Sequence, residues 1–128
     1  MYPRNMFVPN SFKNIEKNGN TVGFEFGCKI QYYRGVTLSI IRDIVVEIDG
    51  VKVDRDNLRF TIDGDSFTLD EMETVVSYRW RFGQAATITV CLEGGLSEGE
   101  HFIRSTQIIA PSYMPMILEN SGEYTFTI

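Results

Sequence analysis

The sequence has 128 residues, of which 43% are hydrophobic, and a formal net charge of −5 at pH 7. This length fits one domain with one core, and the scattered acidic residues leave no basic field for phosphates, which argues against nucleic acid as a partner. No apolar run approaches the roughly 20 residues that cross a bilayer, and the start of the chain lacks the apolar segment of a secretory signal, so we expect a cytoplasmic protein without a membrane contact.

Alternation of apolar and polar residues with a period of two recurs along the chain and predicts half-buried strands. The first and longest run covers residues 22–32. It places one set of side chains toward a core: Val22, Phe24, Phe26, Cys28, Ile30 and Tyr32. The same pattern returns in residues 44–48, 60–62, 88–92 and 124–128. Such strands, with one buried and one solvated face, are typical of antiparallel sheets.

The segments between the strands carry turn and cap signals. Asp49-Gly50 and Asp63-Gly64 each separate two strand patterns, where Asp and Gly tolerate the positive φ of tight hairpins. Thr68 and Glu71 form a capping box, which predicts a short helix of about two turns that ends near Ser77. We therefore predict an all-β fold, an antiparallel β-sandwich with one short helical insertion, as a single domain over residues 1–128.

Cys28 and Cys91 both lie within apolar strand patterns. Intracellular thiols are normally kept reduced, so we expect two buried, free cysteines, with a disulfide as the alternative.

His101 is the one histidine of the chain and the natural candidate for a general base. A base also needs a substrate pocket and an orienting or acidic partner, so we expect His101 to be structural or exposed, with a role at a partner surface as the alternative. One histidine and two cysteines are too few for a usual transition-metal site, and Asp63 and Asp65 fit a hairpin turn better than a Ca²⁺ site or an acid–base pair. We assign no catalytic residue and no metal ligand to this chain.

Residues 78–82 are the first candidate for contact with a partner protein. Alternation would place Tyr78, Trp80 and Phe82 on one side, while Arg79 and Arg81 face the other. Trp and Arg dominate interface hot spots, and arginine recognises carboxylates. The alternative is that Trp80 fills the core and both arginines are solvated.

Residues 108–116 are the second candidate for contact. They are apolar, contain prolines that exclude a central strand, and are rich in methionine, as contact loops commonly are. The contact residues that we select in this loop are Tyr113, Met114 and Met116. The alternative is a loop folded over one end of the sandwich.

Four motifs occur in a fixed order within residues 32–101: RGVTLSII with a following strand that ends in Asp49-Gly50, then FTLDE, then WRFG at residues 80–83, and finally GGLSEGEH. In this order they resemble the small beta subunit of bacterial C-glycoside deglycosidases. The resemblance covers more than half of the chain, and the flanking segments are compatible with it.

The resemblance implies a lyase-type heteromeric complex, of higher order, in which this chain is the non-catalytic beta subunit. The partner would be a TIM-barrel alpha subunit with the acid–base residues and a divalent metal, which we expect to be Mn. The substrates would be 3-oxo C-glycosides of aromatic compounds such as flavonoids, in which the ketone acidifies the C2 hydrogen and the aryl group leaves C1. The beta subunit would stabilise the alpha subunit and shape its active site, without a cofactor of its own.

Two other functions compete with this one. An independent carbohydrate-binding β-sandwich would use Trp80 with Tyr78 or Tyr113 as a platform for sugar rings, and it requires an exposed Trp. A stand-alone isomerase of the β-barrel type would need two or three metal-ligating histidines, and the sequence has one.

Overall fold

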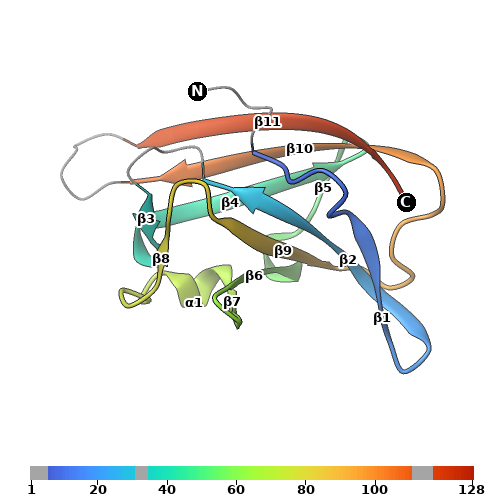
Figure 1. The fold of residues 1–128 in the computed structure, drawn as a ribbon, viewed down its shortest axis with the longest axis horizontal. Helices are drawn as coiled ribbons and strands as arrows, with labels where there is room; N and C mark the ends of the chain where they lie inside the picture. The colour runs from blue at the N-terminus through green and yellow to red at the C-terminus, as the bar shows by residue number, and fades with distance from the viewer. Residues whose placement is uncertain (1–5, 31–34, 111–116) are drawn as a thin grey trace.

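The computed structural model describes residues 6–30, 35–110 and 117–128 and consists mainly of antiparallel strands (Figure 1). The strands are β1 (Lys13–Lys17), β2 (Asn20–Lys29), β3 (Val36–Thr37), β4 (Ile41–Ile48), β5 (Val51–Lys52), β6 (Leu58–Ile62), β7 (Asp65–Thr68), β8 (Arg79–Trp80), β9 (Ala85–Cys91), β10 (Glu100–Ile109) and β11 (Leu118–Thr127). The helical elements are the 3-10 turns η2 (Leu38–Ile40) and η3 (Arg55–Asn57) and the helix α1 (Leu69–Met72).

The strands form two main sheets and a small third one. The first sheet has the order β1-β2-β9-β6-β7, the second has the order β11-β10-β4-β5, and β3 pairs with β8. All of these pairings are antiparallel. The predicted all-β class is therefore confirmed, with two sheets that share one core.

Alternating residues of both sheets form this core, as the period of two predicted. The inward side chains include Phe24, Phe26, Cys28, Ile44, Val46, Ile48, Leu58, Phe60, Ile62, Ala86, Ile88, Val90 and Ile103. Two predicted core residues differ, because Val22 is 41% exposed and Leu92 is 40% exposed. Leu92 follows the last residue of β9, and its amide donates to the carbonyl of Val22, near the start of β2, at 3.1 Å. Tyr32 lies outside the described residues.

Aromatic rings close one side of the sandwich. The ring of Phe12 stacks at 5.3 Å from Phe26 of the first sheet and at 4.1 Å from Phe126 of the second. The same ring stacks at 5.4 Å from Tyr124, and Phe7 stacks on Tyr124 at 5.8 Å. The segment before β1 therefore joins the two sheets: its backbone bonds to β2, where the Val8 amide donates to the Gly27 carbonyl at 3.0 Å, and its rings pack on β11.

Both predicted hairpins and the capping box are confirmed. Asp49 and Gly50 have φ values of 51° and 85°, and Asp63 and Gly64 have 52° and 85°, as tight hairpins of the primed type require. The amide of Glu71 donates to the Thr68 hydroxyl at 3.1 Å, and the Glu71 carboxylate accepts from the Thr68 amide at 2.8 Å.

The helix is shorter than predicted, because it ends at Met72 rather than near Ser77. The residues that follow are β-branched, Thr74, Val75 and Val76, and the Val75 carbonyl accepts a hydrogen bond from the Ser39 amide instead of continuing the helix. No helix in the described part of the chain is both long enough and apolar enough to cross a membrane.

The cysteines differ from each other in exposure, which corrects part of the prediction. Both are free, so the alternative of a disulfide is wrong, but Cys91 is exposed and only Cys28 is buried. Burial raises the pKa of the Cys28 thiol to about 12, although Gln107 donates a hydrogen bond to the sulfur at 3.4 Å. Cys91 is the last residue of β9 and occupies an outward position of the alternation, next to the buried Val90.

Candidate functional site

Trp80 anchors the first candidate contact segment to the core. Its side chain is fully buried, its ring meets Phe60 edge-on at 5.0 Å, and its indole Nε1 donates to the Gln84 carbonyl at 2.9 Å. The indole is therefore enclosed by the core, while contact of residues 78–82 with a partner stays a prediction. Its alternative role as a core residue is the one observed.

Tyr78 and Gln84 tie the same segment to the hairpin at residues 63–65. The Tyr78 ring packs edge-on against Phe67 at 5.2 Å, and its hydroxyl donates to the Asp65 carboxylate. The Gln84 side-chain amide donates to Asp63 at 3.1 Å. Asp63 and Asp65 thus belong to a turn, as expected, and they also position the contact segment.

The outward side of this segment carries cationic and apolar side chains. Arg79 and Arg81 are exposed, and the Phe82 side chain is 54% exposed. Phe82 does not share the burial of Trp80, because β8 ends at Trp80 and Gly83 adopts a positive φ of 87° in the turn that follows. We call the surface formed by Arg79, Arg81 and Phe82 the 79–82 patch.

The second predicted contact region is only partly described. It begins inside β10, where Ile109 is fully buried, so its first residues belong to the sheet rather than to a loop. Tyr113, Met114 and Met116 lie outside the described residues, and their role in contact stays a prediction.

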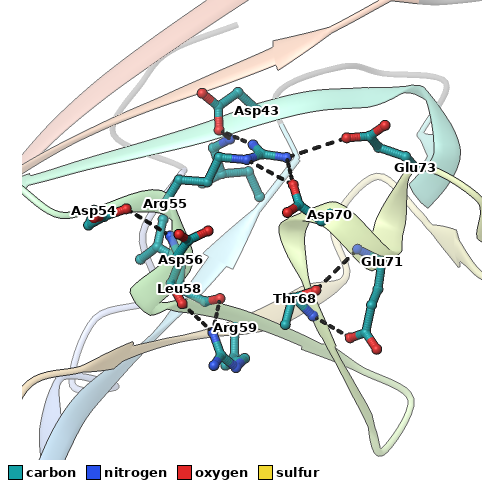
Figure 2. A network of polar contacts seen from close by, with 11 residues as sticks. Asp43, Asp54, Arg55, Asp56, Leu58, Arg59, Thr68, Asp70, Glu71 and Glu73 are labelled. Atoms are coloured by element: carbon teal, nitrogen blue, oxygen red, sulfur yellow. Dashed lines mark hydrogen bonds and ion pairs between the residues drawn. The ribbon is translucent and has the colours of Figure 1, made fainter.

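A salt-bridge network that the sequence did not predict surrounds Arg55 (Figure 2). Its guanidinium donates to Asp43 of β4 at 2.6 Å and to Asp70 of α1 at 3.1 Å. Glu73, just after α1, lies 3.7 Å from the same group. Arg55 therefore connects η3, β4 and the region of α1, and it places the guanidinium among three carboxylates that would otherwise repel one another.

His101 is buried and has two partners, which fits the first part of the expectation that it is structural or exposed. Its Nδ1 lies 2.6 Å from Asp49 Oδ2, and its Nε2 lies 2.7 Å from the Ser97 carbonyl oxygen. The other Asp49 oxygen accepts from the Phe102 amide at 2.9 Å. His101 thus links the β4–β5 turn to the loop before β10.

The two partners decide the charge of His101. A carboxylate and a carbonyl are both acceptors, so the ring satisfies both contacts only as an imidazolium that donates from each nitrogen. Hydrogen bonding to Asp49 raises the pKa of His101, and hydrogen bonding to His101 lowers the pKa of Asp49. An imidazolium has no lone pair for a substrate proton, so this arrangement serves structure rather than general-base catalysis.

An apolar hollow opens between the two sheets beside Asp49. It encloses about 390 Å³, and its floor is made of Phe24, Ile48 and Val90. Val51, which is 69% exposed, lies at its rim. A hollow of this size and character can receive an apolar side chain or an aromatic ring. Within the described ranges, no group of three or more His, Cys, Asp or Glu side chains is arranged to hold a metal ion.

Comparison with known proteins gives three matches. Residues 2–113 match the sequence model of a family described as C-glycoside deglycosidase beta subunit. The chain is 37% identical over 110 residues to a protein of that name from Eubacterium cellulosolvens, and the match covers 85% of this chain and 75% of that protein. It is 22% identical over 89 residues to a protein of the same name from Arthrobacter globiformis, across 70% of this chain and 67% of the relative.

The His101–Asp49 pair should make stability depend on pH. His101 has a raised folded pKa, so its contribution is complete below about pH 6.5, the unfolded value, and is lost as pH rises through the folded value. Asp49 has a lowered folded pKa, so its contribution is present above about pH 4 and is lost as pH falls through the folded value. His101→Gln should lower the free energy of unfolding by about 1–3 kcal/mol at pH 6 and by less at pH 9.

Urea unfolding, followed by the fluorescence of the buried Trp80, measures the free energy of unfolding at pH 6 and at pH 9. Glu100→Gln is the matched control, because this exposed neighbour in β10 changes charge without touching the pair. If His101→Gln and the unchanged chain show parallel pH profiles, the imidazolium assignment is wrong.

Proposed function

The chain belongs to the family of C-glycoside deglycosidase beta subunits, and we propose that it is the non-catalytic beta subunit of a heteromeric C-glycoside deglycosidase. The observation that carries this proposal is the 37% identity to the Eubacterium cellulosolvens beta subunit over 85% of this chain. In this role the chain binds a TIM-barrel alpha subunit, stabilises it and shapes the mouth of its active site.

The chemistry that we propose for the complex belongs to the alpha subunit. The substrates are 3-oxo C-glycosides of aromatic compounds, including flavonoids, and a divalent metal, expected to be Mn, would stabilise the enolate that forms when C2 loses its proton. The C1–aryl bond then breaks by elimination. His101 of this chain does not supply the base in this proposal, because both of its ring nitrogens are already bonded inside the fold.

We place part of the alpha-subunit contact on the 79–82 patch. The exposed Arg81 guanidinium can form paired hydrogen bonds with a carboxylate, and Phe82 offers an exposed apolar ring beside it. Trp80 and Tyr78 hold the backbone beneath from the core side, so little conformational entropy is lost when a partner binds. The predicted contacts of Tyr113, Met114 and Met116 remain part of the same proposal.

The alternative of an independent carbohydrate-binding module has no observation in its favour. It requires Trp80 as an exposed platform for sugar rings, and the Trp80 side chain is fully buried.

Reconstitution tests the proposed role directly. The isolated chain should not convert 3-oxo C-glycosides with or without added Mn²⁺, whereas its complex with an alpha subunit of the family should convert them. Turnover is measured by release of the free aromatic compound. Activity of the isolated chain that disappears when its own residues are substituted would contradict a non-catalytic role, and failure to bind any alpha subunit would contradict the assignment as a subunit.

Charge reversal tests the location of the contact. Arg81→Glu and Phe82→Ala should each weaken alpha-subunit binding by about tenfold or more, because hot-spot residues in interfaces cost this much when lost. Arg42→Glu is the control, because Arg42 is also exposed but lies in β4. Dissociation constants from calorimetry give the comparison. Equal effects of Arg81→Glu and Arg42→Glu would mean that net charge, not the 79–82 patch, controls binding.

His101→Gln tests whether this chain reaches into the chemistry. In a complex shown by mass to be fully assembled, the substitution should lower kcat by less than about tenfold, whereas removal of a true general acid or base costs about 10²- to 10⁴-fold. A hundredfold loss of kcat in the assembled complex would show that His101 takes part in catalysis.

A further inference from the structure

The edge strand β11 presents a long row of backbone groups without partners among the described residues. Gly99 and Ile128 exchange both backbone hydrogen bonds, and the register from Glu100↔Thr127 to Ile109↔Leu118 is unbroken. Hydrogen-bonded and non-hydrogen-bonded pairs alternate along an antiparallel ladder. Counting back from Ile128 in steps of two, Phe126, Tyr124 and Gly122 therefore bond to β10 through their backbone groups. The backbone groups of the residues between them therefore point outward from the sheet: Glu119, Ser121, Glu123, Thr125 and Thr127.

The other three edges of the main sheets are protected, and β11 is not. β1 has an irregular register between Ile15 and Glu16 and carries Lys13 and Lys17. β5 has two residues. On the neighbouring edge of β4, the Asp43 carboxylate accepts a hydrogen bond from the Ile44 amide, so this amide already has a partner. β7 has four residues. In contrast, β11 has ten residues with no proline, no lysine and no bulge, which is the kind of edge that invites another strand.

Ring contacts hold this open edge in an extended shape. Phe12 stacks on Tyr124 and Phe126 from the inner side, and Phe7 stacks on Tyr124. On the outer side, Arg104 donates to Glu123 at 2.8 Å. The strand is thus fixed before any partner arrives, which reduces the entropy cost of pairing. In Figure 1, β11 runs along the top of the molecule and β10 lies below it.

We propose that β11 binds β11 of a second copy of this chain, antiparallel and centred on Gly122, so that two four-stranded sheets become one continuous sheet. This two-fold arrangement uses the same edge of both copies, as the commonest type of homodimer does. It sets Glu119 opposite Thr125 of the second copy and Ser121 opposite Glu123.

The acidic residues of β11 select this register. Shifting the centre by one residue toward Ser121 would place Glu119 opposite Glu123, and shifting it toward Glu123 would place the two copies of Glu123 opposite each other. Like charges directly opposite are destabilising in a sheet. The register centred on Gly122 avoids both conflicts and pairs the strand over its whole length, so the edge is complementary to itself.

This inference is independent of the proposed function, because it concerns the isolated chain. The first measurement is the mass of the full chain by sedimentation equilibrium across a concentration series, with amide hydrogen exchange in parallel. We expect a reversible dimer. The amides of Ser121, Glu123 and Thr125 should gain protection as the dimer forms, while those of Gly122 and Tyr124 should be protected at every concentration.

Substitutions at Thr125 test the register. Thr125→Lys should tighten the dimer and Thr125→Glu should weaken it, with dissociation constants that differ by about tenfold, because each residue meets Glu119 of the other copy. Thr125→Pro removes an outward amide and should give a monomer, while Thr125→Ala keeps the amide and should remain a dimer. Circular dichroism and the fluorescence of Trp80 check that every variant is folded.

A monomer at all concentrations overturns the proposal. A dimer whose dissociation constant is the same with Thr125→Lys, Thr125→Glu and Thr125→Pro also overturns it. Protection of the outward amides only when an alpha subunit is added would also overturn it, because the edge would then belong to a different partner. That last result leaves the proposed function intact, so the two proposals fail separately.

Discussion

One shared apolar interior holds the two main sheets together, and it determines which side chains remain for any other purpose. Each long strand gives alternate residues to this interior, and Phe12 bridges Phe26 and Phe126 at its side. Even Trp80, which from its sequence context is the most attractive contact residue, is drawn into the core. What is left for recognition lies at strand ends, at turns and along the edges of the sheets.

The polar networks at these margins organise the loops around the sandwich. Arg55 joins β4 to the region of α1 through Asp43 and Asp70, and the His101–Asp49 pair joins the β4–β5 turn to the loop before β10. Buried or partly buried charges are costly unless each has a partner, and these groups have theirs. The polar side chains that resemble catalytic residues are thus occupied in holding loops.

The strands, both hairpins and the capping box could be predicted from the sequence, because each depends on residues within a few positions of one another. The His101–Asp49 contact spans 52 positions, and Arg55 reaches partners 12 and 15 positions away, so no local pattern indicates them. Leu92 after β9 and Phe82 after β8 are exposed because alternation no longer governs burial beyond the end of a strand. Cys91 is exposed for a different reason, because it occupies an outward position of β9. The length of the helix could not be predicted in the same way. The capping box indicates where the helix begins, but β-branched residues end it at Met72.

The 79–82 patch and the β11 edge can be used at the same time. In Figure 1, β11 runs along the top of the molecule, whereas β8 and α1 lie below it, beyond β4. A second copy bound along β11 would extend the second sheet, whereas β8 pairs with β3 in a separate small sheet. Two-fold pairing of beta subunits would therefore present two 79–82 patches, each able to bind an alpha subunit. The two proposals thus use two different surfaces of the chain, the β11 edge for a second copy and the 79–82 patch for the alpha subunit.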